Sequence, residues 1–214
     1  MLPLRRRFLM TVFVLAFSIL LAPLANARFQ STRMPAGVQA SGDEFWSDEF
    51  SFPGTGNIDY NIVEDMVEFQ GALIVGGRFT EANGGPGNGI ARWDGTSWST
   101  LETGMDGDVY ALYVHNGVLY AGGSFQHAGG ITVAGIARWD GTTWSDMGSG
   151  TNGTVYAIQY YGGYIMAGGV FTIAGGISAK SIAGWRLSTQ TWIALGSGII
   201  GTVYALASHH FYLY

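Results

Sequence analysis

The feature that most constrains the fold of this chain is an internal repeat with a step of 46 residues. The pair Gly76-Gly77 recurs at Gly122-Gly123 and again at Gly168-Gly169. Two tryptophans per unit keep the same register, with one two-residue insertion before the last of them, and they stand at Trp93, Trp139, Trp185, Trp98, Trp144 and Trp192. A repeat of this length indicates that each unit is one supersecondary module that buries its apolar surface against its neighbours.

One unit reads as four antiparallel strands joined by short turns. Residues 109–114 (VYALYV) are apolar and rich in β-formers, which predicts a strand buried on both faces. Asn116-Gly117 predicts a tight hairpin to a second strand over 118–122. A glycine-rich loop is expected over 124–135, followed by strands over 136–139 and 143–146. Asp140-Gly141 between these last two strands predicts a type I′ turn with both φ angles positive.

The pattern of Gly-Gly, a strand ending in Trp-Asp, a turn and a second Trp resembles the kelch-type, galactose-oxidase-like β-propeller repeat. The fuller string of residues 121–150 (AGGSFQHAGGITVAGIARWDGTTWSDMGSG) is similar to repeats of secreted bacterial propellers and of the fungal cortical cell-polarity marker. The resemblance covers about residues 44–206 and implies an all-β propeller of four-stranded antiparallel blades. It also implies a role in binding or adhesion.

The expected propeller spans residues 44–214 and is incomplete, with three full blades and partial strands at both ends. The blades are predicted over 63–108, 109–154 and 155–202, and a fourth begins within 203–214. Closed propellers have about four to eight blades. The segment 44–52 would supply the outer strand of the closing blade in a longer protein. The chain is therefore expected to be a fragment of a longer repeat protein, or a chain completed by self-association through open blade edges.

Residues 1–27 have the layout of a secretory signal peptide, with three arginines, an apolar stretch and an Ala-Asn-Ala cleavage site. A permanent membrane anchor is the alternative, and a twin-arginine export route is a lesser one. Residues 28–43 are predicted to be a flexible lead-in. We expect a secreted, periplasmic or cell-surface protein that meets the membrane only through an uncleaved leader.

Composition removes several function classes. After the leader, seven basic residues face fifteen acidic ones, which disfavours binding to nucleic acid. The chain has no cysteine, so it has no thiolate metal site, no cysteine nucleophile and no Tyr–Cys crosslink of the galactose-oxidase type. The four histidines do not have metal-ligand spacing. We expect no cofactor, no metal and no catalytic residues.

Loop positions that differ between the units are the predicted binding surface, because a repeat protein specialises where equivalent positions vary. The loops and the connections between units are expected on one face of the molecule. The candidate binding residues are Arg78, Glu81, Asn83, Asp106, Asp108, His127 and Asn152. The recurring tryptophans and glycines are interpreted as packing residues, and a calcium site at Asp106 and Asp108 as the weaker alternative to a solvated loop.

The leading hypothesis is a secreted, non-catalytic binding or scaffold module whose partner is an extracellular protein or glycan. The alternative is a propeller-based glycan hydrolase or lyase, which requires two converging carboxylates. Glu81, Asp106 and Asp108 are its candidates. A third hypothesis is a purely structural fragment without a ligand.

Overall fold

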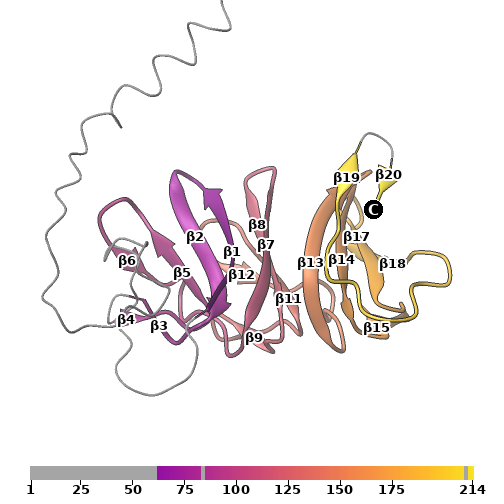
Figure 1. Ribbon diagram of the computed structural model, residues 1–214, viewed down its shortest axis with the longest axis horizontal. Helices are drawn as coiled ribbons and strands as arrows, with labels where there is room; N and C mark the ends of the chain where they lie inside the picture. Colours follow the sequence, from indigo (N-terminus) through magenta and orange to yellow (C-terminus); the bar gives the residue numbers. More distant parts are fainter. Residues whose placement is uncertain (1–61, 83–84, 210–211) are drawn as a thin grey trace, which may run out of the picture. The chain divides into compact units, whose positions relative to one another are not determined.

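The computed structural model describes residues 62–82, 85–209 and 212–214, and the predicted leader, lead-in and segment 44–61 lie outside them. The described residues form strands and no helix, which confirms the all-β class. They build three four-stranded antiparallel sheets that follow one another along the chain (Figure 1). The described strands do not close into a ring, so the sheets alone establish the all-β architecture rather than a propeller.

Each sheet is a meander whose strands follow in chain order, apart from a small excursion between its second and third strands. The first sheet contains β1 (Ile62–Phe69), β2 (Ala72–Arg78), β5 (Ile90–Trp93) and β6 (Trp98–Ser99). The second contains β7 (Val109–His115), β8 (Val118–Gly123), β11 (Ile136–Trp139) and β12 (Trp144–Ser145). The third contains β13 (Thr154–Tyr161), β14 (Tyr164–Val170), β17 (Ile182–Arg186) and β18 (Thr191–Ala194).

The glycine-rich loops contain more structure than the sequence predicts. Each holds a two-stranded hairpin, and the three hairpins lie on the same side of their sheets (Figure 1). Their strands are β3 (Glu81–Ala82) with β4 (Gly85–Pro86), β9 (His127–Ala128) with β10 (Ile131–Thr132), and β15 (Ile173–Ala174) with β16 (Ile177–Ser178). The prediction of plain loops was wrong because two-residue strands leave no hydrophobic periodicity to detect.

The two kinds of predicted hairpin turn had different outcomes. At Asn116-Gly117 both φ angles are positive, 48° and 74°, which confirms the primed turn. At Asp140-Gly141 only Gly141 has a positive φ, 107°, so the type I′ prediction was wrong. The carboxylate Oδ1 of Asp140 instead accepts the backbone N–H groups of Thr142 at 2.7 Å and Thr143 at 2.9 Å, and this Asx-type arrangement sets the turn.

The predicted fourth unit begins differently from the others. Residues 202–207 form no strand, and the chain then makes the short hairpin β19 (Ser208–His209) with β20 (Tyr212–Leu213). Val203 still lies where the valines of earlier units lie, since its side chain packs at Gly168 as Val155 packs at Gly122, and its N–H donates to the Gly169 carbonyl at 3.0 Å. Residues 202–207 thus make the contact with the preceding sheet that a first strand makes, but they do not form a strand of a fourth sheet.

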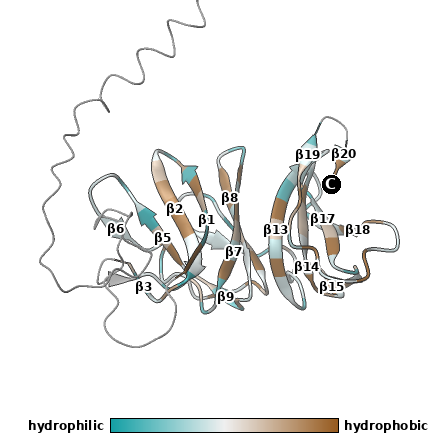
Figure 2. Cartoon of the chain, in the orientation of Figure 1, coloured by the Kyte–Doolittle hydropathy of each residue, from teal (hydrophilic) through white to brown (hydrophobic). Residues whose placement is uncertain are grey.

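Two of the three hydrophobic clusters lie between neighbouring sheets, and the third lies within the first unit, around Val75 and Ala91. One cluster joins Ile74 and Leu101 of the first sheet's unit to Val109 and Leu112 of the second. A second cluster joins Tyr120 to Val155 and its neighbours on the third sheet in the same way. Hydrophobic stretches lie on the strands of the sheets, and hydrophilic stretches lie on parts of β5, β13 and β19 (Figure 2). Because a single sheet cannot bury both faces alone, neighbouring sheets supply each other's core.

The recurring tryptophans form one pair in each sheet, with ring centroids 5.3–5.5 Å apart. In the second and third sheets all four are buried: Trp139, Trp144, Trp185 and Trp192. The indole N–H of Trp144 donates to the Leu101 carbonyl at 3.3 Å, and that of Trp192 donates to the Met147 carbonyl at 2.5 Å. Each bond reaches back to the preceding unit, so these tryptophans link neighbouring sheets.

Candidate functional site

A β-bulge at the same register in every sheet brings the candidate site together. The first strand of each sheet carries one extra residue, which has no partner on the second strand: Glu64, Tyr110 and Tyr156. Bulges redirect a side chain relative to the regular pleat and concentrate next to functional sites. Three bulges in equivalent positions therefore place three different side chains along one edge of the molecule.

The glycine pairs explain why the bulge forms there. A Cβ on the second glycine of a pair, Gly77, Gly123 or Gly169, would overlap a backbone carbonyl oxygen of the bulged strand. A Cβ on the first glycine would instead press into the following unit, as at Gly122, where Val155 Cγ1 lies 2.7 Å away. The first glycine thus serves packing between sheets, and the second permits the bulge.

A row of tyrosines results from this register. The ring centroids of Tyr110 and Tyr156 are 5.1 Å apart, and those of Tyr156 and Tyr204 are 5.3 Å apart. Tyr110 and Tyr156 are half-buried, whereas Tyr204 is 73% exposed. Each ring offers an apolar surface and a hydroxyl group, which is the combination that favours tyrosine at binding surfaces.

Charged side chains continue the row at the first sheet. Nη2 and Nε of Arg78 donate to Oε1 of Glu64 at 2.8 and 3.0 Å. The hydroxyl of Tyr110 donates to Asp108 Oδ2 at 2.9 Å. We call Glu64, Arg78, Asp108, Tyr110, Tyr156 and Tyr204 the rim cluster.

The protonation of the rim cluster follows from these contacts. The hydrogen bond to Glu64 raises the pKa of Arg78 and outweighs the opposite effect of burial, and the charges of Glu64 and Asp108 raise it further, so its guanidinium stays cationic. Burial raises the pKa of Tyr110, and the hydrogen bond to Asp108 adds to the effect, so its hydroxyl stays protonated. The rim cluster therefore combines hydroxyl donors, one cation and two carboxylates.

Two of the predicted binding residues hold loops in place. Asp106 Oδ1 accepts the N–H groups of Gln126 at 2.7 Å and His127 at 2.8 Å, and Oδ2 lies 2.6 Å from His127 Nδ1. Asn152 occupies the equivalent position one unit later, where its Oδ1 accepts the N–H groups of Thr172 at 2.8 Å and Ile173 at 2.9 Å. Both residues tie the connection between units to the hairpin of the next unit.

The His127 pair also affects the charge of Asp106. Burial alone would raise the pKa of this carboxyl, but hydrogen bonds from the His127 side chain, the His127 N–H and the Gln126 N–H outweigh it and lower the pKa. Asp106 thus remains a carboxylate engaged on both oxygens. Because both oxygens are already engaged, Asp106 is better suited to hold the hairpin in place than to bind a ligand.

The structure brings only part of the predicted set together. Arg78 and Asp108 belong to the rim cluster, whereas Asp106, His127 and Asn152 lie at the loop connections. Glu81 is half-buried in β3, and Asn83 lies outside the described residues. Sequence reasoning missed four members of the rim cluster: Glu64, Tyr110, Tyr156 and Tyr204. The available signal was the tyrosine that recurs after the first valine of each unit and is replaced by Glu64 in the first.

Across 62–82, 85–209 and 212–214, no three histidine, aspartate or glutamate side chains come together as metal ligands would. The described part of the chain also contains no helix with the length and apolar character needed to cross a membrane.

Comparison with known proteins adds no assignment. No protein-family model matches the chain, and no curated protein matches it.

Proposed function

We propose that the chain is a secreted or cell-surface, non-catalytic binding module built as an incomplete β-propeller of kelch-like blades. Three consecutive four-stranded sheets that share cores with their sequence neighbours support the blade assignment. The first strands β1, β7 and β13 lie beside one another, and β6, β12 and β18 form the opposite edges of their sheets. This is the strand order of propeller blades around an axis.

The observation that carries the binding role is the rim cluster. Equivalent positions of successive units supply a row of three tyrosines, Tyr110, Tyr156 and Tyr204, and the first unit has Glu64 at that position. An aromatic row beside hydrogen-bonding groups suits either a sugar ring, which has an apolar face and a polar edge, or an extended peptide. The partner is therefore an extracellular protein or glycan held at the rim.

The test is a binding screen of the purified chain against a glycan array and extracellular protein extracts, with Tyr204→Ala as the probe variant. Tyr212→Ala is the matched control, because both tyrosines belong to the C-terminal segment and are similarly exposed, at 73% and 66%. We expect Tyr204→Ala to weaken binding by about tenfold, the effect of losing one well-placed aromatic contact, and Tyr212→Ala to leave it unchanged. Equal losses in both variants would refute the assignment to the rim.

The same screen decides the enzymatic alternative. Glu64 and Asp108 both interact with Arg78, so two carboxylates, the number that a glycan hydrolase requires, lie near one side chain. Each captured glycan is therefore also assayed for released products. If a glycan is cleaved and Asp108→Asn abolishes the cleavage, the chain is a glycan hydrolase or lyase and not a binding module. If a glycan is bound but not cleaved, the result supports the binding module.

A further inference from the structure

The contact between neighbouring sheets follows one rule that repeats along the chain. In each unit the first glycine of the pair, which we call the receiving glycine, packs against two side chains of the following unit. These are a valine and the apolar residue three positions later, which we call the inserting pair. Gly76 receives Val109 and Leu112, and Gly122 receives Val155 and Ile158. Gly168 receives Val203 and Leu206 from the C-terminal segment in the same way.

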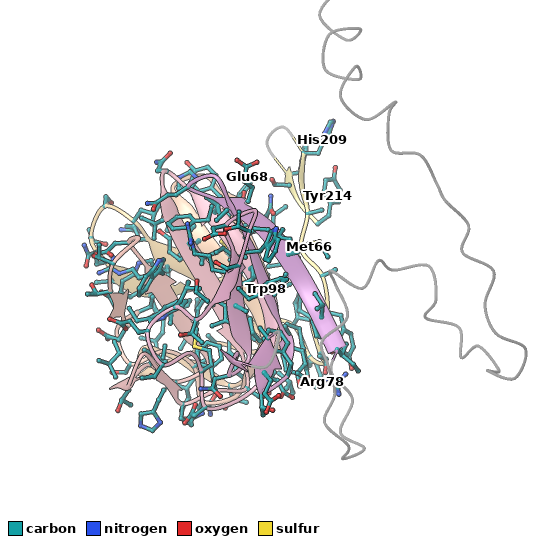
Figure 3. All side chains as sticks on the ribbon, turned by 90° about the vertical axis from the view of Figure 1, so that its left-hand side faces the viewer. Met66, Glu68, Arg78, Trp98, His209 and Tyr214 are labelled. Atoms are coloured by element: carbon teal, nitrogen blue, oxygen red, sulfur yellow. The ribbon has the colours of Figure 1, made fainter. Side chains whose placement is uncertain are left out.

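This rule leaves one inserting pair without a receiving glycine. Val63 and Met66 occupy the equivalent positions of the first unit, so the described chain has four inserting pairs and three receiving glycines. Leu112 and Ile158 are 4% and 7% exposed, whereas Met66 is 52% exposed. Met66 lies on β1 between Glu68 and the end of the sheet marked by Arg78 (Figure 3). Among the described residues, no receiving glycine packs against the inserting pair of the first sheet, of which Met66 is exposed and Val63 is partly buried.

At the opposite end, the receiving surface is covered only by a single segment. Residues 202–207 form no strand, although Val203 is 8% exposed against Gly168. Ile199 is 44% exposed, while Met105 at the same position is 5% exposed. The third sheet is thus covered less well than the first and second sheets are.

We propose that two copies of this chain associate head to tail, with the first sheet of one copy packing on the third sheet of the other. Val63 and Met66 of one copy insert at Gly168 of its partner and displace the pair Val203 and Leu206. A complete four-stranded sheet then replaces a lone segment, and the new contact repeats the interface that each copy already makes twice. The C-terminal segment acts as a competitor that keeps the receiving surface closed in the single chain.

Head-to-tail contacts generate either rings or open filaments, depending on whether the rotation closes. The described residues of two copies contain six four-stranded sheets, a number within the range of about four to eight blades of closed propellers. The expected product is therefore a two-copy ring. Closure into that ring rests on the proposed propeller, but the head-to-tail contact itself does not.

The test measures the mass of the secreted chain in solution by sedimentation equilibrium over a wide range of concentration. Two substitutions at equivalent positions have opposite expected effects. Met66→Glu should weaken association by more than about tenfold, because it places a charge in the inserting pair. Leu206→Glu should strengthen association, because it weakens the competing segment and leaves the glycine and the inserting pair intact.

Ile131→Glu is the matched control, since Ile131 is 40% exposed on β10 and belongs to neither end surface. Circular dichroism establishes that each variant is folded before it is measured. Monomers at all concentrations for both the wild type and Leu206→Glu would overturn the proposal, as would an oligomer that Met66→Glu leaves intact. An open filament that Met66→Glu abolishes would keep the head-to-tail contact and overturn only the closed ring.

Discussion

The first glycine of each pair should tolerate a side chain only when the valine that packs on it is shortened. In the present fold a Cβ at Gly122 would stand 2.7 Å from Val155 Cγ1 and 3.0 Å from Ile158 Cδ1. Carbon atoms in ordinary contact lie about 3.5–4.0 Å apart, so Gly122→Ala forces the second and third sheets to move or a rotamer to change. We expect a cost of about 1–3 kcal/mol, typical of overpacking in a well-packed core.

Shortening the opposing side chain should recover much of this cost. Val155→Ala alone removes two buried carbon groups and leaves a cavity, at a cost of about 2 kcal/mol. In the double variant the new methyl group at residue 122 enters the space vacated by Cγ1 of Val155. The double variant should therefore be about 1–2 kcal/mol more stable than the sum of the single effects predicts.

Urea unfolding of the four proteins in this cycle measures the coupling directly. Gly117→Ala provides the control, because a Cβ at Gly117 meets nothing within 4 Å and its cost comes from the positive φ of 74°. Its effect should add to that of Val155→Ala. If the Gly122 and Val155 effects also add, to within about 0.5 kcal/mol, the two sheets do not pack as described.

Three further predictions concern hydrogen bonds. Backbone hydrogen bonds from Thr143, joined by those from Thr142, lower the pKa of Asp140 from 3.8 to about 2. The carboxylate therefore stabilises the fold above its unfolded pKa, and the melting-temperature loss caused by Asp140→Asn should shrink as the pH falls from about 4 to about 2. Trp192→Phe should cost more stability in chemical denaturation than Trp185→Phe, by about 1 kcal/mol, because of these two indole N–H groups that of Trp192 has a hydrogen-bond partner in the described residues and that of Trp185 has none. Asp65→Ala should cost about 1–3 kcal/mol, measured the same way, since it removes the acceptor of the Leu112 N–H, 2.8 Å away, that joins β1 to β7; an unchanged stability would contradict this.

The sequence was sufficient to predict the strands and the alternation of units because these depend on local composition. The apolar run that begins at Val109 favours a β-strand, and Asn116-Gly117 favours a two-residue hairpin turn with positive φ angles. The predicted strand at Val109 is nevertheless less buried than expected, since Tyr110 and Tyr113 are half-buried. A first strand at the edge of its sheet has one neighbouring strand, and its apolar composition does not reveal this position.

The bulges could not be predicted from the same residues. Tyr110 follows Val109 in an uninterrupted apolar run, and nothing in that run marks where the register shifts. The shift depends on Gly123 of the neighbouring strand, whose missing side chain leaves room for the Asp108 carbonyl. A feature created by two strands together becomes visible only when their pairing is known.

Asp106 and Asn152 show how variation between repeats can mislead. They were predicted to bind a ligand because they are polar and differ between units, yet both place a side-chain oxygen on two N–H groups of the next hairpin. A carboxylate and an amide oxygen both accept hydrogen bonds, so this position varies while its structural role is kept.

Variation has a different meaning at the bulges. Glu64 and Tyr110 share one backbone position, but a carboxylate and a phenol ring share neither shape nor charge, so no common structural role accounts for both. The same holds for Arg78, the last residue of β2, and Ser124, the residue that follows β8 at the equivalent position. Substitutions that change chemistry while the backbone stays constant are the ones that give each unit its own surface. This distinction, rather than variability alone, favours the rim cluster over the loop connections as the site for the proposed binding function.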